Sequence, residues 1–295
     1  MWLVYSVLSA VAFGIRGIFY QRLSPIPLDR NLLLAGVFFT GFLLSLMLGL
    51  LTGQTWGPES AVGILMGTFS FAANSALYRG FAVGKPSIVA VLAALSPIVA
   101  TLGAWLLWDE RLNTGQAASF LLIIAGVVLI RYAGDFTLSH WNSAKWGFAA
   151  MLSFGVTDLH TKWSTMLGAE LYPTLTCMFG AGIALCLLAR RFAKAGRAGE
   201  KAGHTPNPGR APDEWTDRRT FSVGMLIGVT NVIGMYLIVP AFDTGITGLV
   251  SAIVSLNVVL ILLYTRFVVR ERFMPRETAG ILLTIGGVVL LRLLA

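Results

Sequence analysis

Two charged side chains stand inside strongly apolar stretches of this sequence. Arg16 lies in FGIRGI at 13–18, and Asp158 lies in FGVTDL at 154–159. A guanidinium binds carboxylate or phosphate groups, whereas a carboxylate binds an amine or a proton. An ionisable side chain in hydrocarbon costs about 2.5–3.5 kcal/mol, so each one requires an explanation. We expect the two side chains to bind opposite ends of one substrate. The alternatives are that Arg16 extends to the interface and that Asp158 pairs with Lys162, its i+4 neighbour.

Amides and hydroxyls at comparable depth complete the predicted substrate site. Asn74 and Tyr78 lie one turn apart and so share a face of their helix. Asn231 lies in the corresponding helix of the second half of the chain, and Asn257 lies in the helix that follows. Such groups bind a polar substrate, or they bond between helices, where each bond contributes only about 0.6–2 kcal/mol. We include all four in the predicted site.

Proton coupling is predicted for Asp158 together with His160. Histidine changes charge near neutral pH and is therefore suited to carry protons. Residues two apart on a helix point to different faces, so the alternative is that one of the pair meets the membrane interface. The sequence contains no metal-type spacing, no phosphate-binding glycine loop and no Ser/His/Asp arrangement with supporting context. We therefore predict no enzyme activity, no metal and no cofactor.

The composition is that of an integral membrane protein. Apolar residues make up 56% of the chain and charged residues 12%, well below the roughly 25% usual in soluble domains. A net charge of +8 would suggest nucleic-acid binding in a soluble chain, but these basic residues lie mainly between apolar segments. They indicate orientation in a lipid bilayer, and we expect no nucleic-acid partner.

A helix needs about 20 apolar residues to cross the hydrocarbon core. On this criterion the sequence divides into ten predicted transmembrane helices. The polar segment 193–220, rich in Gly, Pro and basic residues, is predicted to be a flexible linker. The ten helices are expected near 2–21, 31–52, 60–82, 86–108, 113–132, 145–166, 172–192, 221–242, 246–268 and 275–294.

The two halves of the chain resemble each other. A shift of 161 positions places Glu110-Arg111 on Glu271-Arg272, and GVVLIR at 126–131 on GVVLLR at 287–292. Each half has an odd number of helices, so the second half must enter the membrane from the opposite side. The predicted fold is an all-α membrane protein whose ten transmembrane helices form two inverted five-helix repeats, as is typical of secondary transporters. The predicted units are residues 1–132 for the first repeat, 133–192 for the first two helices of the second repeat, 193–220 for the linker and 221–295 for the last three helices.

Two five-helix halves, WLLWDERLNTGQ after the fourth span and GVVLIR closing the fifth, give the sequence a family resemblance. It resembles the EamA branch of the drug/metabolite transporter superfamily over the whole chain apart from the linker. The resemblance implies a ten-helix bundle with alternating access around a central cavity, lined mostly by the first, third, fourth, sixth, eighth and ninth helices.

The predicted function is secondary active transport of a small polar metabolite. An amino acid or a related amphoteric compound is the leading substrate, coupled to protons through Asp158 or moved by exchange. One alternative is an exchanger or facilitator of anionic metabolites centred on Arg16. The other is a lipid-linked flippase.

Basic residues concentrate in the odd-numbered loops and in the linker. By the positive-inside rule these segments are predicted to be cytoplasmic, with both termini outside a cell (inner or plasma) membrane. Gly126 and Gly286-Gly287 predict close packing of the fifth and tenth helices, the pair through which a homodimer could form.

Two further features bear on conformational change. The helix-end pairs Glu110-Arg111 and Glu271-Arg272 predict solvated turns or caps, with a gate as the alternative. Pro97 and Pro240 lie inside predicted helices and remove backbone hydrogen bonds. They mark bending points for gating, or else tolerated kinks.

Overall fold

The computed structural model describes residues 1–23, 26, 28–83, 86–131, 141–200, 216–264, 267–268 and 274–294. Within these ranges the chain is helical and contains no strand, so the predicted all-α class is confirmed. The elements are α1 (Trp2–Leu23), α2 (Arg30–Leu51), the 3₁₀ helix η1 (Pro58–Ala61), α3 (Val62–Val83), α4 (Pro86–Ala93), α5 (Ser96–Trp108), α6 (Thr114–Arg131), α7 (Trp141–Met166), α8 (Leu171–Glu200), α9 (Asp217–Thr244), α10 (Thr247–Val254), α11 (Asn257–Tyr264) and α12 (Pro275–Leu294).

The helices follow the ten predicted spans with two differences. The fourth span is split into α4 and α5, and the ninth into α10 and α11. In addition, α8 continues to Glu200 and α9 begins at Asp217, so both ends of the 193–220 segment are helical. Six of residues 193–200 are Ala, Lys, Arg or Glu, which are good helix formers, and they extend the helix despite Gly196 and Gly199. Residues 201–215 lie outside the described residues.

Seven described stretches are long and apolar enough to cross a membrane, and α6 adds a shorter apolar helix at Thr114–Ile130. The chain is therefore a multi-pass membrane protein. α7 does not meet the hydropathy criterion and carries Lys145, Asp158 and Lys162, which lower its hydropathy. Crossing of the membrane by α6, α7 and α12 stays a prediction.

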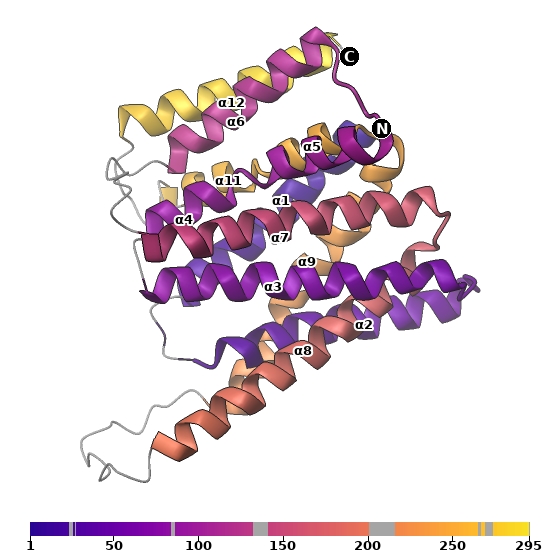
Figure 1. Ribbon diagram of the computed structural model, residues 1–295, viewed down its shortest axis with the longest axis vertical. Helices are drawn as coiled ribbons and strands as arrows, with labels where there is room; N and C mark the ends of the chain where they lie inside the picture. The colour runs from indigo at the N-terminus through magenta and orange to yellow at the C-terminus, as the bar shows by residue number, and fades with distance from the viewer. Residues whose placement is uncertain are drawn as a thin grey trace.

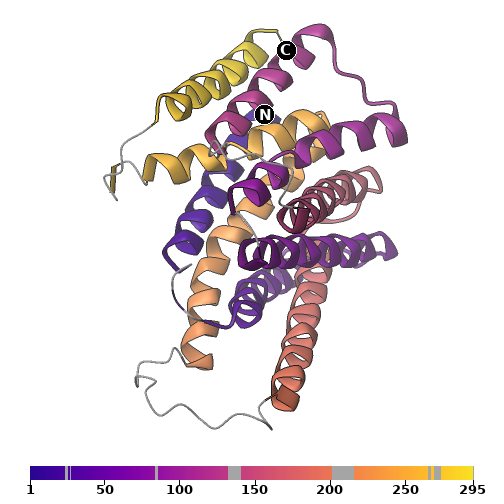
Figure 2. The ribbon, with the colours of Figure 1, turned by 60° about the vertical axis from the view of Figure 1, so that its left-hand side comes forward.

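The molecule has two ends that the chain visits alternately. Both termini lie at one end, which we name the terminal face, as Figures 1 and 2 show. The end of α8 and the start of α9 lie at the opposite end, which we name the linker face. There Arg190 of α8 donates to Asp29 at 2.7 Å and also bonds to Asp217 of α9.

Helix packing recurs between the two halves. The repeat relates α1 to α7, α2 to α8, α3 to α9 and α6 to α12. α1 and α2 of the first half both pack on α9 of the second half. In the same way, α7 and α8 of the second half both pack on α3 of the first half. α2 with α8, and α6 with α12, pair with their own counterparts. Figure 1 shows the α6–α12 pair along the upper edge. This exchange of partners is what two inverted repeats produce.

The repeat extends to single contacts between helices. A Cβ added at Gly228 of α9 would lie 2.7 Å from the Val37 carbonyl oxygen of α2. The equivalent Gly67 of α3 lies in the same way against the Met178 carbonyl of α8. The shift of 161 positions takes Gly67 to Gly228. A shorter shift of 141 positions, which also aligns Phe13-Gly14 with Phe154-Gly155, takes Val37 to Met178. Glycine at these positions lets two helix backbones approach closely.

The two helix breaks are also repeat-related. α4 ends at Ala93 and α5 begins at Ser96, while 161 positions later α10 ends at Val254 and α11 begins at Asn257. A break frees backbone N–H and C=O groups, which a membrane protein tolerates only where they are buried in protein or line a cavity. The breaks therefore locate the polar centre of the fold.

The shared Phe-Gly pairs of FGIRGI and FGVTDL lie against these breaks. A Cβ added at Gly155 would lie 2.9 Å from the Ser96 carbonyl oxygen, and one at Gly14 would lie 3.2 Å from that of Asn257. The two stretches share this glycine because a broken helix packs closely against it in each half of the chain.

The apolar core forms two main clusters. The larger lies among α1, α2, α3, α8 and α9, where Phe179 and Phe242 are fully buried. The second lies where the α6–α12 pair packs on α10, around Ile123, Ile253 and Leu291. Together they hold the helices that surround the centre of the molecule.

Glycines of the α6–α12 pair act within the chain. Gly126 lies against Gly280 and Thr284 of α12, and Gly287 lies against Ile123 of α6. Only open space surrounds Gly286 within 4 Å. The close packing predicted for these two helices is present inside one protomer, and a homodimer through their outer surface stays a proposal.

Candidate substrate cavity

A cavity of about 530 Å³ lies at the centre of the bundle. It is lined by α1, α2, α3, α7 and α9, by Met178 of α8 and by both pairs of broken helices. Ala93 and Ser96 line it from the first break, and Val254 and Asn257 from the second. The structure brings six residues of the sequence-predicted substrate site together on its wall: Arg16, Asn74, Tyr78, Asp158, Asn231 and Asn257.

Arg16 crosses from α1 to α9 inside the cavity. Its Nη1 donates a hydrogen bond to Asn231 Oδ1, and its guanidinium lies 4.6 Å from the Phe13 ring centroid. The Nε atom is buried and has no hydrogen-bond partner. Arg16 therefore does not extend to the interface, and one of its donors is unused.

Asp158 of α7 faces the same cavity. Its Oδ2 accepts a hydrogen bond from Ser251 of α10. The alternative pairing with Lys162 is not formed, because the Lys162 ammonium is held elsewhere. Neither Arg16 nor Asp158 contacts an oppositely charged side chain in the described part of the chain.

The two charges lie at neighbouring positions of repeat-related helices. A shift of 141 relates Arg16 to Thr157 and Gly17 to Asp158. All four residues line the cavity. Adjacent positions on equivalent helices have thus acquired opposite charges around one space.

The remaining predicted polar residues leave hydrogen-bonding capacity at the wall. Asn74 Nδ2 donates to the Ser70 carbonyl of its own helix at 2.8 Å. The Tyr78 ring lies below the Arg30 guanidinium, 5.1 Å from centroid to Cζ. Asn257 is the first residue of α11, so it adds a side-chain amide at the break.

His160 does not line the cavity, and the proton relay with Asp158 stays a prediction. Its Nδ1 is hydrogen-bonded to the Val156 carbonyl at 2.7 Å. Its ring stacks on Phe69 at 5.3 Å and meets Trp163 edge-on at 5.9 Å. Residues two apart on a helix point to different faces, which accounts for the separation.

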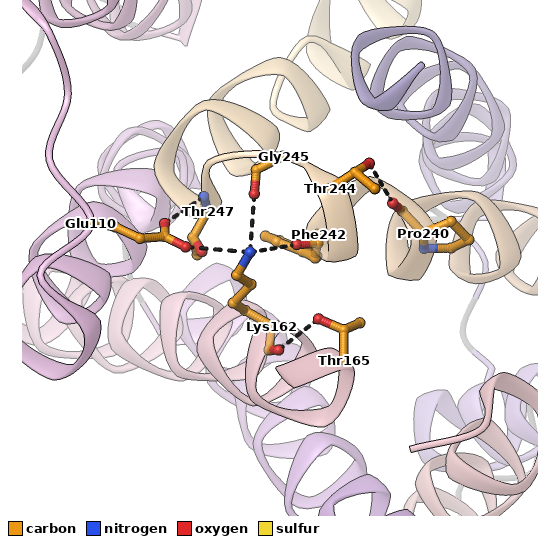
Figure 3. A network of polar contacts seen from close by, with 8 residues as sticks. All are labelled: Glu110, Lys162, Thr165, Pro240, Phe242, Thr244, Gly245 and Thr247. Carbon is orange, nitrogen blue, oxygen red and sulfur yellow. Dashed lines mark hydrogen bonds and ion pairs between the residues drawn. The ribbon is translucent and has the colours of Figure 1, made fainter. Parts of the chain in front are cut away.

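A polar network closes the bundle at the terminal face. Lys162 Nζ donates to the carbonyls of Phe242 at 2.8 Å and Gly245 at 3.2 Å, and lies 3.3 Å from Glu110 Oε1. Glu110 Oε2 also accepts from the Thr247 N–H at 2.9 Å. Figure 3 shows these groups converging from the end of α5, from α7 and from the α9–α10 junction.

The Glu110-Arg111 pair thus divides into two roles. The Glu110 and Lys162 side chains are only 19% and 12% exposed, which makes their ion pair part of the packed interior. Arg111 pairs with Asp109 at 2.9 Å, and both are more than 70% exposed, as expected of a solvated turn. Glu271-Arg272 lies outside the described residues.

The cavity reaches toward the linker face. Its wall includes Leu23, Leu28 and Arg30 at that end of the bundle. Gln21 and Phe81, the repeat equivalents of Lys162 and Phe242, also line it. Two positions that are packed within the terminal-face network, those of Lys162 and Phe242, thus have repeat equivalents that line the cavity at the linker face.

Sequence reasoning missed several members of this site. Ser251 gave no signal, because a serine within an apolar helix is common. Arg30 was read only as a loop charge, and Lys162 only as a local partner of Asp158. Among the described residues, no group of His, Cys, Asp or Glu is placed to hold a metal ion.

Comparison with known proteins gives two matches. Residues 1–132 match the EamA-like transporter family. The fold is similar to that of a solved protein, described only as "Crystal structure of protein", with a TM-score of 0.75 and 17% sequence identity over 99% of this chain and 97% of the other. This likeness concerns the fold alone. No curated protein matches the chain significantly.

Proposed function

We propose that the chain is an EamA-like membrane transporter that moves a small amphoteric metabolite by secondary active transport, since residues 1–132 match the EamA-like transporter family. An amino acid or a related compound fits this description. The observation that carries the proposal is that Arg16 and Asp158 line one cavity, and neither is neutralised by a charged side chain among the described residues.

Opposite charges in one low-dielectric space favour a substrate that carries both. A buried charge is stable only when it is paired and hydrogen-bonded. A carboxylate would meet the unused Nε donor of Arg16, and an amine would meet Asp158. A purely anionic substrate would place a second negative charge near Asp158. A purely cationic substrate would leave the positive charge of Arg16 without a partner. The volume of about 530 Å³ lies within the 300–1,000 Å³ usual for small-molecule sites.

Alternating access follows from the two ends of the repeat. In this proposal the Glu110–Lys162 ion pair is the closed gate at the terminal face, and substrate enters the cavity from the linker face; the ion pair and the cavity lining support it. In the opposite conformation the network separates, and Gln21 and Phe81 take up the packing that Lys162 and Phe242 have here. Glutamine carries no charge, so in this proposal closure at the linker face lacks an ammonium at this position.

We place the linker face in the cytoplasm, since the basic residues concentrate there. In intact cells, a cysteine at position 216 should then resist an impermeant maleimide until the membrane is permeabilised. Ready labelling without permeabilisation would reverse the orientation and leave the mechanism unchanged.

Asp158 is the proposed coupling residue. It is the one carboxylate among the described lining residues, and Ser251 is its sole hydrogen-bond donor there. A proton and a substrate amine would compete for it, so proton release on one side and substrate binding on the other are linked through one group.

The test is uptake into proteoliposomes of radiolabelled alanine, aspartate and O-phosphoserine, with and without an inward proton gradient. Asp158→Asn should abolish gradient-driven uptake and spare exchange, because asparagine keeps a hydrogen bond to Ser251 but cannot take up a proton. Arg16→Gln should abolish both modes. Asp243→Asn is the matched control, because Asp243 is exposed and does not line the cavity. The proposal fails if the wild type moves none of these solutes, or if Asp158→Asn and Asp243→Asn behave alike.

A further inference from the structure

We propose that Arg30 binds a second acidic group of the substrate, so that the preferred solute is an amphoteric molecule with two anionic groups and one amine. The proposal rests on the function proposed above and names the substrate class of the same cavity. A monoamino dicarboxylate and a phosphorylated amino acid both have this chemistry.

Arg30 is placed at the linker end of the cavity with its charge uncompensated. It is the first residue of α2, and its side chain is among those that line the wall. Its guanidinium lies over the Tyr78 ring, 5.1 Å from the centroid. In the described part of the chain it forms no hydrogen bond or ion pair, so its five N–H donors are free for a ligand.

The neighbouring carboxylate does not neutralise it. Asp29 Oδ1 accepts from the Leu32 N–H at 3.1 Å and so caps the start of α2. Asp29 Oδ2 accepts from Arg190 Nε at 2.7 Å. With both oxygens engaged, Asp29 fixes the position of the Arg30 backbone and leaves the Arg30 side chain to the cavity.

The charges on the cavity wall are then unequal. Arg16, Arg30 and Asp158 are the charged side chains among the described lining residues, which gives two positive charges against one negative. A neutral zwitterion would balance Arg16 and Asp158 and leave Arg30 without a counter-charge. A solute with two acidic groups and one amine balances all three.

Tyr78 and Asn74 extend the polar wall toward Arg30. Tyr78 lies one turn from Asn74 on the same face of α3, and the Arg30 guanidinium lies over its ring. Arg16, Tyr78 and Arg30 all line the cavity. An elongated solute with its two acidic groups at the two arginines can place its amine at Asp158.

The experiment compares uptake of aspartate, O-phosphoserine and alanine by the wild type, Arg30→Gln and Arg79→Gln in proteoliposomes. We expect the wild type to prefer aspartate or O-phosphoserine over alanine. Arg30→Gln should lower that preference by about tenfold or more, as loss of a bidentate guanidinium contact does, while alanine uptake persists. Arg79→Gln is the control, because Arg79 is exposed near the same face, stacks on Trp146 and does not line the cavity.

The outcomes separate this inference from the function on which it rests. If aspartate is preferred, the second group is a carboxylate, and if O-phosphoserine is preferred, it is a phosphate; both support the proposal. Equal loss in Arg30→Gln and Arg79→Gln would show a general surface-charge effect and overturn it. Equal loss of all three solutes in Arg30→Gln would show a structural role and also overturn it. Alanine uptake without any acidic preference defeats only the inference, whereas uptake of none of the solutes defeats the proposed function itself.

Discussion

Replacing Glu110 by glutamine should make the terminal face open more often. The variant keeps the length and an acceptor oxygen of the side chain but removes the charge opposite Lys162. The ammonium then retains only the carbonyls of Phe242 and Gly245 as full partners. Since this network joins α5, α7 and the α9–α10 junction, weakening it destabilises the closed terminal face specifically.

The size of the effect follows from the burial of the pair. With side chains 12% and 19% exposed, solvent screens the Lys162–Glu110 interaction only weakly. For this ion pair we take about 1.5–3 kcal/mol, the lower part of the roughly 1.5–7 kcal/mol range of coupling energies of close charge pairs. Each 1.4 kcal/mol is a factor of ten, so the ratio of terminal-open to terminal-closed molecules should rise about 10- to 150-fold. A state populated at about 1% would then reach roughly 10–60%.

Thr247→Cys provides the reporter. Thr247 is fully buried behind the network, and its hydroxyl has no hydrogen-bond partner, so the cysteine removes no side-chain hydrogen bond. In a background with Cys177 and Cys186 replaced, the rate of maleimide labelling from the terminal face measures opening. We expect Glu110→Gln to raise that rate by the factor given above.

Arg111→Gln is the matched control, because it removes the adjacent charge from an exposed pair whose contribution is about 0–1 kcal/mol. Equal labelling in the Glu110 and Arg111 variants would refute the assignment of the network as a gate. The double variant Glu110→Gln, Lys162→Met completes the cycle. If the two changes simply add, the ion pair carries no coupling and the reasoning fails.

Two further predictions concern positions away from the wall. His160→Phe should leave the pH dependence of uptake unchanged, because the phenyl ring keeps the stack and His160 does not line the cavity; a shifted profile would support the relay with Asp158. Gly287→Ala should lower the melting temperature of the purified protein, since its Cβ would lie 2.8 Å from the Ile123 side chain, at a cost of about 1–3 kcal/mol. Gly286→Ala meets open space and should not lower it, unless a second copy covers that surface.

The sequence predicted the class of fold and the gathering of polar residues, because both depend on the energetics of the membrane. Polar groups are costly in hydrocarbon, so Arg16, Asn231 and Asp158 had to share an interior space wherever their helices came together. The constant offset between similar residues predicted the correspondence of the two halves. Both inferences use only the position of a residue along its helix and the repeat of the sequence, which can be read without a structure.

The sequence did not predict which polar side chains form hydrogen bonds or ion pairs with each other. Lys162 lies four residues after Asp158, and spacing alone favours their pairing. In the fold, Lys162 reaches Glu110 and two carbonyls beyond the end of α9. Contacts of this kind depend on the crossing of helices distant in sequence, and no local pattern encodes them.

The helix breaks show how a local signal can mislead about cause. Pro97 marks the first break, and a proline lacks the N–H that a helix needs. The second break has Val258 at the equivalent position, yet it has the same hydrogen bonds. At the first break the backbone N–H groups of residues 94, 95 and 98 donate to the carbonyls of residues 90, 92 and 95. At the second break the N–H groups of residues 255, 256 and 259 donate to the carbonyls of residues 251, 253 and 256, which are the same positions shifted by 161.

Pro97→Ala should therefore keep the break between α4 and α5. Val258 donates to the Ser255 carbonyl at 3.4 Å, and an alanine N–H at 97 can donate to Ala94 in the same way. Packing of Gly155 against the Ser96 carbonyl would hold the broken form, with a loss of about 0.4–1 kcal/mol of stability from the more flexible unfolded chain. Uptake and the spin-label distance between the ends of α4 and α5 should match the wild type. A lengthened distance together with lost uptake would mean that the proline, and not the repeat, makes the break.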